Sequence, residues 1–247
     1  MLKIEKATFR YSRLERPVLD HLNLHVHKGD FVAVLGANGA GKSTLLRAIS
    51  SQLMLDSGKV LLEGNLLKSI SVADKAKDIG YVFQNSLAGT FPEMSIKENL
   101  MLAMQRGLSG NLRLEDLDLT MAQKELKKVE LGLDKKMTSK VSSLSGGQRQ
   151  ALSLIMTTLA PLKVLLLDEH CAALDPRTSD KVMKLSEKII VEKQLTCLMV
   201  THNLEHALKY ANRIVILQDG KLKHDILDKT SLASHELYDL MYKEASL

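Results

Sequence analysis

Gly-Ala-Asn-Gly-Ala-Gly-Lys-Ser-Thr, residues 36–44, follows the apolar run Phe-Val-Ala-Val-Leu at 31–35 and leads into a segment, 42–49, with helical spacing of apolar residues. Strand, glycine-rich turn and helix in this order are the context in which G-x-x-x-x-G-K-[ST] forms a phosphate-binding loop. Glycines at 36, 39 and 41 let backbone N–H groups converge on phosphate oxygens, and the helix N-terminus adds partial positive charge. We expect Lys42 to reach the β- and γ-phosphates and Ser43 to ligate Mg²⁺. The alternative is a glycine-rich turn with a surface lysine, which the flanking strand and helix disfavour.

Composition limits the class of protein. The 247 residues are 45% hydrophobic and 26% charged, enough to bury a core in one large or two small domains. No apolar run approaches the roughly 20 residues that span a bilayer, and the first ten residues carry charges where a signal peptide needs an apolar core. The two cysteines form neither a disulfide framework nor a metal-ligand spacing. We therefore expect a cytoplasmic chain.

The net charge of +5 is spread along the chain, with basic and acidic residues interleaved. A basic balance alone is compatible with nucleic acid or an anionic membrane surface. Without a basic cluster or interleaved aromatic residues, we predict no nucleic-acid partner.

Hydrophobic periodicity predicts the order of elements. Strand patterns occupy 4–11, 22–26, 59–62 and 79–83, and the alternation at 22–26 leaves His25 and His27 on a wet face. Helical spacing follows at 94–105 and 121–131, joined by a glycine-rich connection at 107–111. Helices at 180–191 and 231–247 and strands at 164–167, 196–201 and 213–217 complete the pattern. We predict an α/β P-loop NTPase fold: a RecA-like core with an N-terminal β subdomain at 1–85 and 161–247, and an inserted helical subdomain at 86–160.

Leu-Ser-Gly-Gly-Gln at 144–148 opens a further predicted helix that runs to about residue 159 and is stopped by Pro161. Ser145 is a suitable N-cap, and the two glycines leave the first-turn N–H groups uncovered by side chains. The pattern indicates a second helix N-terminus that can receive an anion. The alternative is a capped helix with a purely structural role.

Acidic residues follow the apolar strand at 164–167. Asp168 and Glu169 stand at its carboxyl end, the edge where open α/β sheets bind ligands. We expect Asp168 to hold Mg²⁺ through its waters and Glu169 to orient a water nucleophile; the alternative is an acidic loop start. His202, at the end of the strand 196–201, is a candidate donor to a terminal phosphate. His202 and His206 lie four apart on the next predicted helix but lack the Glu of a metalloprotease motif.

Together these segments resemble the ATP-binding subunit of ABC transporters. The resemblance implies that Tyr11 stacks on adenine, that Gln84 senses Mg²⁺ and the attacking water, that Glu169 is the catalytic carboxylate and that His202 is the switch histidine. It also implies a larger nucleotide-contacting set, which is Tyr11, Gly36, Asn38, Gly39, Gly41, Lys42, Ser43, Thr44, Ser145, Gly146, Gly147, Gln148 and Asp175. The metal ligands that it implies are Ser43, Gln84 and Asp168.

The resemblance further implies partners and a location. Two copies would form a head-to-tail homodimer around ATP, with the surface at 85–98 receiving a short helix from an integral membrane permease. A solute-binding protein would act through that permease, and the subunit would lie on the cytoplasmic face of the cell membrane.

His170 and Cys171 depart from the residues that usually follow the catalytic Glu. With the sequence at 87–90, they resemble a less-characterised bacterial branch associated with importers of amino acids or similar small solutes. We expect Cys171 to be reachable by thiol reagents. The alternative function is that of a soluble, non-transport ABC ATPase, as in iron–sulfur cluster assembly.

Overall fold

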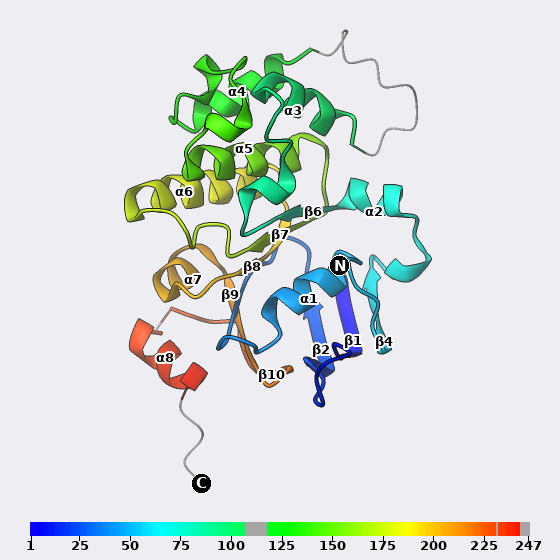
Figure 1. Cartoon of the computed structure of the whole chain (residues 1–247). Helices are drawn as coiled ribbons and strands as arrows, with labels where there is room; N and C mark the ends of the chain where they lie inside the picture. The colour runs from blue at the N-terminus through cyan, green and yellow to red at the C-terminus, as the bar shows by residue number, and fades with distance from the viewer. Residues whose placement is uncertain (107–117, 231, 243–247) are drawn as a thin grey trace. The chain divides into compact units, whose positions relative to one another are not determined.

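The computed structural model describes residues 1–106, 118–230 and 232–242 (Figure 1). The chain divides into two units. The first unit comprises Met1–Ser71 and Leu195–Leu247, and the second comprises Val72–Gln194. The second unit contains all of the segment 86–160 for which we predicted a helical subdomain, together with elements on either side of it. The exact bounds of that subdomain stay a prediction.

The first unit is built on strands from both ends of the chain. Its elements are β1 (Leu2–Phe9), β2 (Leu19–Val26), β3 (Phe31–Leu35), α1 (Lys42–Ile49), β4 (Ser57–Leu62), β5 (Asn65–Leu66), the 3₁₀ turn η1 (Leu67–Ser69), β8 (Thr196–Val200), α7 (Leu204–Tyr210), β9 (Arg213–Gln218), β10 (Lys221–Ile226) and α8 (Ser234–Tyr242).

Strand β3 lies between β8 and β9 and runs parallel to both, with Val32 opposite Leu198 and Arg213. Every residue of β3 and of β8 is buried. Parallel strands are covered on both faces, so they consist of continuous apolar residues rather than alternating ones. Because neighbouring parallel strands end at the same edge, the segments that follow β3 and β8 emerge close together.

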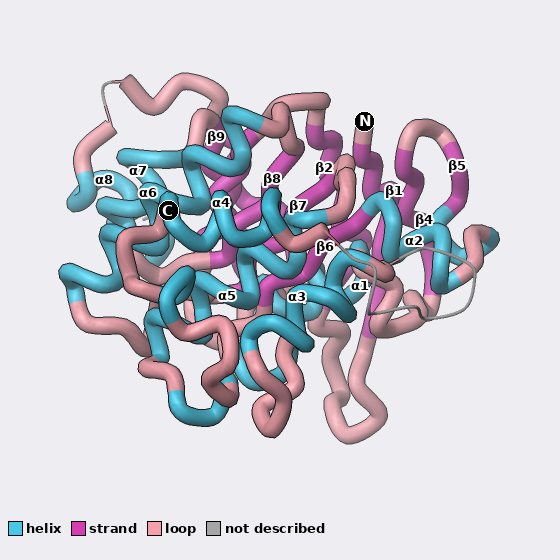
Figure 2. Tube along the Cα trace, turned by 90° about the horizontal axis from the view of Figure 1, so that it is seen from above, coloured by secondary structure: helices cyan, strands magenta, loops and turns pink. Residues whose placement is uncertain are grey.

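Strands β2, β1, β4 and β5 form a separate antiparallel sheet in that order. Figure 2 shows β1, β4 and β5 as neighbouring strands of this sheet. Along β2 the leucines at 22 and 24 are buried while Asn23 and His25 are exposed. This confirms the predicted wet face, which is usual where an antiparallel sheet covers the core on one side only.

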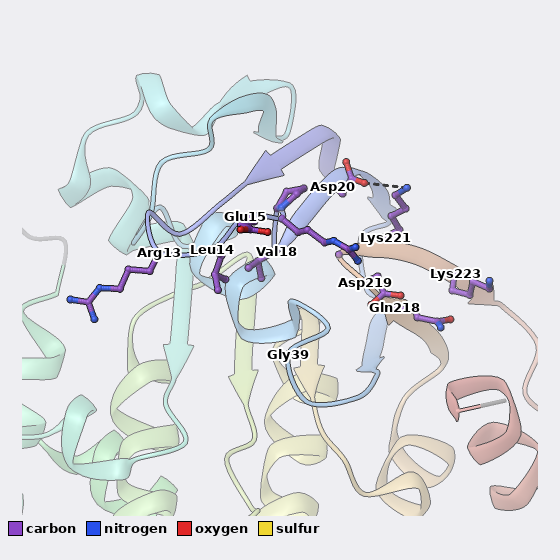
Figure 3. A pocket seen from close by; sticks show the side chains of 13 residues that line it. Arg13, Leu14, Glu15, Val18, Asp20, Gly39, Gln218, Asp219, Lys221 and Lys223 are labelled. Atoms are coloured by element: carbon purple, nitrogen blue, oxygen red, sulfur yellow. Dashed lines mark ion pairs between the residues drawn. The ribbon is translucent and has the colours of Figure 1, made fainter. Parts of the chain in front are cut away.

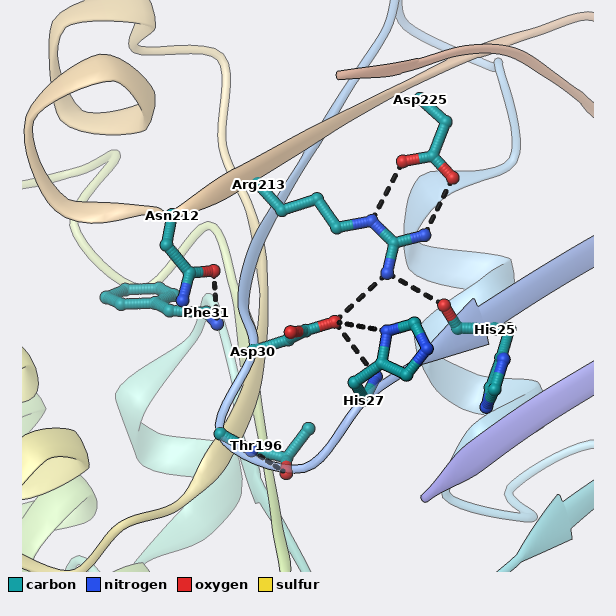
Figure 4. A network of polar contacts seen from close by, with 9 residues as sticks. His25, His27, Asp30, Phe31, Thr196, Asn212, Arg213 and Asp225 are labelled. Atoms are coloured by element: carbon teal, nitrogen blue, oxygen red, sulfur yellow. Dashed lines mark hydrogen bonds and ion pairs between the residues drawn. The ribbon is translucent and has the colours of Figure 1, made fainter. Parts of the chain in front are cut away.

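A buried arginine ties the first unit together. Arg213 at the start of β9 donates from Nε and Nη2 to Asp225 of β10, at 2.8 and 2.7 Å (Figure 4). Its Nη1 donates to Asp30 Oδ2 at 3.0 Å and to the His25 carbonyl at 2.8 Å. Hydrogen bonding to Asp225, followed by the bond to Asp30, raises the pKa of Arg213. The forked guanidinium thus joins the β9–β10 hairpin to β2 and to the turn before β3.

The second unit carries most of the helices. Its elements are α2 (Val72–Asp78), β6 (Ile79–Val82), η2 (Ser86–Gly89), α3 (Ile96–Met104), α4 (Thr120–Lys128), η3 (Leu133–Lys135), η4 (Val141–Ser143), α5 (Gly146–Leu159), β7 (Val164–Asp168) and α6 (Pro176–Glu192). Strands β6 and β7 pair in parallel, with Ile79 opposite Val164. The glycine-rich connection predicted at 107–111 lies outside the described residues.

Several elements differ from the sequence prediction. Helix α6 begins at Pro176, four residues earlier than expected, because Asp175 caps it and proline suits the first helical position. His202 precedes α7 rather than lying on it, since Asn203 is the N-cap. Helix α2 and strand β10 were not predicted. Helix α8 occupies Ser234–Tyr242 of the predicted 231–247 helix, and residues 231 and 243–247 of that prediction lie outside the described part.

Candidate functional site

The loop 36–44 joins the end of β3 to the start of α1, as predicted, and its glycines have the positive φ angles that this tight path requires. Gly39 has φ 82° and Gly41, the N-cap of α1, has φ 100°. A Cβ on Gly36 would lie 2.3 Å from the Leu217 carbonyl oxygen. Asn38 and Gly39 are exposed at the tip. The loop therefore has an exposed tip and ends at the N-terminus of α1, and helix N-termini receive anions.

Lys42 is buried, with 6% of its surface exposed, and folds back over the loop. Its Nζ donates to the carbonyls of Gly36 at 2.7 Å and of Ala37 at 2.9 Å. These bonds hold the ammonium group over the residues that precede the helix. A phosphate seated in the loop would meet a fixed positive charge there.

Tyr11 lies beside the same helix start. Its hydroxyl is 3.4 Å from Thr44 Oγ1, and its ring packs edge-on against Phe9 with 4.8 Å between centroids. The rest of the ring is accessible to solvent, since Tyr11 is 37% exposed. The structure thus brings Tyr11 to Thr44 at the end of the loop, 33 residues further along the sequence.

His202 is exposed in the turn between β8 and α7. The turn is held by two backbone donors: Thr201 N–H reaches Val34 O at 3.4 Å, and Asn203 N–H reaches Thr201 Oγ1 at 3.0 Å. The first of these bonds attaches the turn to the end of β3. His202 therefore stands at the edge of the sheet from which the phosphate loop also emerges.

A pocket of about 1070 Å³ opens next to the phosphate loop within the first unit (Figure 3). The loop of residues 13–18 and the β9–β10 hairpin line it, and Gly39 contributes from the phosphate loop. Charges of both signs surround it, and Lys221 pairs with Asp20 at 3.1 Å. Tyr11 is not part of its lining. A ligand bound at the phosphate loop therefore has room to extend into this pocket.

In the second unit, two neighbouring carboxylates meet side chains from the end of β6. Asp168, the last residue of β7, is buried, and its Oδ2 accepts a hydrogen bond from the Tyr81 hydroxyl at 2.7 Å. Glu169 follows with a left-handed φ of 44°, and its Oε2 accepts from Gln84 Nε2 at 3.3 Å. Positive φ at a residue other than glycine is uncommon and clusters at functional sites. The predicted pair Gln84 and Glu169 is thus in contact.

Ser145 caps α5, which confirms the predicted start of that helix. Its Oγ accepts from Gln148 N–H at 3.3 Å, while Gln148 Oε1 accepts from Ser145 N–H at 3.1 Å, forming a capping box. Ser145 and Gly146 are exposed. Gly147 is buried against α6, because a Cβ there would lie 2.0 Å from Thr178 Cγ2. The N-terminus of α5 is therefore both rigidly capped and accessible.

Asp175 lies at the neighbouring end of α6. Its Oδ1 accepts from Thr178 N–H at 3.1 Å, and hydrogen bonds from the Thr178 side chain and backbone lower the pKa of its carboxyl group. Thr178 donates a hydrogen bond to Asp175, and its methyl group lies against Gly147. The N-termini of α5 and α6 are therefore adjacent.

The two unusual residues after Glu169 have local structural explanations. His170 is buried with Nε2 3.0 Å from Ser186 Oγ on α6. Cys171 is only partly exposed, and burial raises the pKa of its thiol to about 12. The nucleophilic thiolate is therefore scarce at neutral pH, so the thiol should react slowly there, and the expected access of thiol reagents to Cys171 stays a prediction.

Sequence reasoning missed Tyr81 as a neighbour of the site. The signal available was a single hydroxyl in an otherwise buried strand, three residues before Gln84.

Among the residues that the structure describes, no group of three or more His, Cys, Asp or Glu side chains is arranged to hold a metal ion. No helix within that part of the chain is long and apolar enough to cross a membrane.

Comparison with known proteins identifies the family. The model of the ABC transporter family matches residues 19–172. A tyrosine transport ATP-binding protein of Clostridioides difficile is 44% identical over 221 residues, covering 86% of this chain and 85% of the relative. A thiamine import ATP-binding protein of Photorhabdus laumondii is 35% identical, covering 94% and 93%.

The solved structures agree with the sequence relatives. A dimeric ATP-binding cassette in a post-hydrolysis state, with bound ADP and Pi, superposes with a TM-score of 0.79 at 28% identity, covering 92% of this chain and 99% of that structure. The predicted P-loop α/β fold and the predicted activity are thereby confirmed. This chain belongs to the ABC transporter family and is an ATP-binding, ATP-hydrolysing component of it.

Proposed function

We propose that this chain powers the import of a small solute, an amino acid or a compound of similar size, by hydrolysing ATP on a partner membrane permease. The observation that carries the proposal is its 44% identity, over most of both chains, to a protein named for tyrosine transport. Relatives named for thiamine import support the same direction of transport. These names favour a transport role over a soluble, non-transport ATPase.

Within the first unit, the phosphate loop and Lys42 would bind the triphosphate of ATP. The ammonium group is already held at the loop by two carbonyl contacts, so little ordering is needed when phosphate arrives. The accessible Tyr11 ring would stack on adenine, while Asn38, Ser43 and Thr44 belong to the same phosphate loop. His202 would donate to the terminal phosphate from the turn after β8.

Mg²⁺ fits the residue types available. A serine hydroxyl, a glutamine amide oxygen and a carboxylate, supplied by Ser43, Gln84 and Asp168, are hard oxygen donors of the kind that Mg²⁺ accepts. Mg²⁺ keeps several waters and binds nucleotide phosphates, so it needs only a few ligands from the protein. When bound, it would neutralise charge on the phosphates. Glu169, oriented by Gln84, would accept a hydrogen bond from the attacking water.

We infer that two copies act together, head to tail. The capped and accessible N-terminus of α5, with Ser145, Gly146 and Gly147, would meet the phosphates of ATP bound by the partner copy. Gln148 would keep Ser145 in place through the capping box, and Asp175 would lie in the loop that crosses the dimer. ATP would then join the two copies, and its hydrolysis would loosen them.

The permease would dock on the surface at 85–98. Two large apolar side chains, Leu87 and Phe91, are exposed there at 39% and 55%. Asn99 of α3 fixes the backbone at Phe91. Its side chain accepts a hydrogen bond from Phe91 N–H at 2.8 Å and donates one to Phe91 O at 3.0 Å. A short amphipathic helix from the permease would find an ordered apolar surface. The subunit would then lie on the cytoplasmic face of the cell membrane, and a solute-binding protein would deliver solute to the permease.

The test combines capture with uptake. Glu169→Gln protein, loaded with ATP, is used to capture partners from detergent-solubilised membranes of the source cell, and the partners are identified by mass spectrometry. Uptake of labelled tyrosine and of labelled thiamine is then compared in cells with and without the gene. A multi-span permease and loss of tyrosine uptake support the proposal. Recovery of soluble assembly proteins only, with both uptakes intact, refutes it.

A further inference from the structure

The hydroxyl of Tyr81 contacts the Asp168 carboxylate. Tyr81 is the third residue of β6, and Asp168 is the last residue of the parallel partner strand β7. Register places Tyr81 beside Leu166, so its side chain reaches along β7 to the carboxylate two residues further on. The donor–acceptor distance is 2.7 Å.

A phenol that donates to a carboxylate forms a charge-assisted hydrogen bond, which is about twice as strong as a neutral one. The bond to Oδ2 restricts rotation of the Asp168 carboxylate, so both of its oxygens keep defined directions. Outer-shell partners of this kind orient the groups that hold metals, and their loss typically costs about 10- to 100-fold in metal affinity.

The Tyr81 ring is itself held in place. It packs against Phe83 with 4.5 Å between ring centroids, and Gly80 and Val82 on either side of it are buried in β6. Three residues after Tyr81, Gln84 contacts Glu169 at 3.3 Å. The end of β6 and the segment that follows it thus contact both carboxylates at the end of β7.

We propose that Tyr81 is a positioning residue for Mg²⁺–nucleotide binding, acting through its hydrogen bond to Asp168. The inference rests on the proposed role of Asp168 as a metal-holding residue. Tyr81 contributes one hydroxyl, and in this proposal it acts on the metal only through Asp168.

The test variant is Tyr81→Phe, which removes one oxygen and keeps the ring against Phe83. The affinity for a fluorescent ATP analogue is measured in EDTA and across a Mg²⁺ titration, and Mn²⁺ binding to the nucleotide complex is followed by electron paramagnetic resonance. We expect the half-saturating Mg²⁺ and Mn²⁺ concentrations to rise about tenfold or more. Affinity in EDTA should stay unchanged. Tyr238→Phe, on the exposed face of α8, is the matched control and should change neither quantity.

Asp168→Asn separates this inference from the proposed function. If Asp168→Asn raises the half-saturating metal concentration and Tyr81→Phe leaves it within twofold, the inference about Tyr81 is wrong and the role of Asp168 stands. If neither variant changes it, the proposed metal role of Asp168 fails. Equal losses of affinity for Tyr81→Phe in EDTA and in Mg²⁺ would mean that Tyr81 serves the fold, which also overturns the inference.

Discussion

Two glycines of the phosphate loop provide a matched pair for testing the loop geometry. Gly39 and Gly41 both have positive φ, at 82° and 100°. A Cβ on Gly39 would meet nothing within 4 Å, whereas a Cβ on Gly41 would lie 2.5 Å from the Val18 carbonyl oxygen. Gly220 approaches the same oxygen, to which its own Cβ would lie at 2.7 Å. Val18 therefore has little freedom to retreat from a new methyl group at Gly41.

The difference in stability between the two alanine variants measures the steric cost of the added methyl group at Gly41. Left-handed backbone costs a non-glycine residue about 1–2 kcal/mol, and both variants carry this cost. Gly41→Ala adds an overlap about 0.9 Å short of ordinary contact at 3.4 Å. Overpacking of this kind costs about 1–3 kcal/mol. At about 3 °C per kcal/mol for a domain of this size, we expect Gly39→Ala to lower Tm by about 3–6 °C and Gly41→Ala by about 3–9 °C more.

Nucleotide-free thermal unfolding, followed by circular dichroism and calorimetry, measures both variants against the unmodified chain. Without nucleotide, differences in ligand stabilisation do not contribute. The reasoning is refuted if Gly41→Ala unfolds at the same temperature as Gly39→Ala or above it. That result would mean that the backbone around Val18 moves away from the added methyl group without any loss of stability.

Three further substitutions or reactions test other contacts. Arg213→Lys loses the forked contact with Asp225, so its free energy of unfolding in urea should fall by about 2–3 kcal/mol, and an unchanged midpoint would contradict the network. Labelling of Cys171 by maleimide should be slow at pH 7 and accelerate towards pH 9, because burial raises the pKa of the thiol to about 12 and favours the protonated form at neutral pH; rapid labelling at pH 7 would contradict this. Gly147→Ala should lower Tm by overlap with Thr178 Cγ2, and Thr178→Ser, which removes that methyl group, should restore most of the loss.

Local patterns were enough to predict the elements that carry the phosphate loop. Strand β3 is a continuous apolar run, α1 begins and ends where the periodicity indicates, and Ser145 caps α5 as its side chain and the Gln three residues later suggest. Each of these features depends on residues within a few positions of one another. Sequence periodicity and capping chemistry therefore contain the information needed to predict them.

Contacts between distant segments could not be predicted in this way. Tyr81 meets Asp168 from 87 residues away, and Arg213 joins Asp30 from 183 residues away. No spacing rule connects such residues, because strand order and register decide which of them become neighbours. His202 lies at the end of the strand as predicted, but its placement on the next helix was wrong for a more local reason: Asn203 caps α7 and excludes the histidine from the helix. A stronger weight on Asn as an N-cap would have found this boundary.

Glu169, the carboxylate that Gln84 contacts, is the residue on which the proposed ATP hydrolysis depends most. The direct measurement is steady-state ATP turnover by Glu169→Gln protein together with its affinity for ATP, each compared with the unmodified chain and with Lys42→Ala. The substitution keeps the size of the side chain and removes the charge that orients water. We predict that kcat falls by about 100-fold or more while ATP affinity is retained, and that Lys42→Ala loses affinity instead. Full turnover by Glu169→Gln would contradict the assignment of Glu169 and, with it, the proposed mechanism.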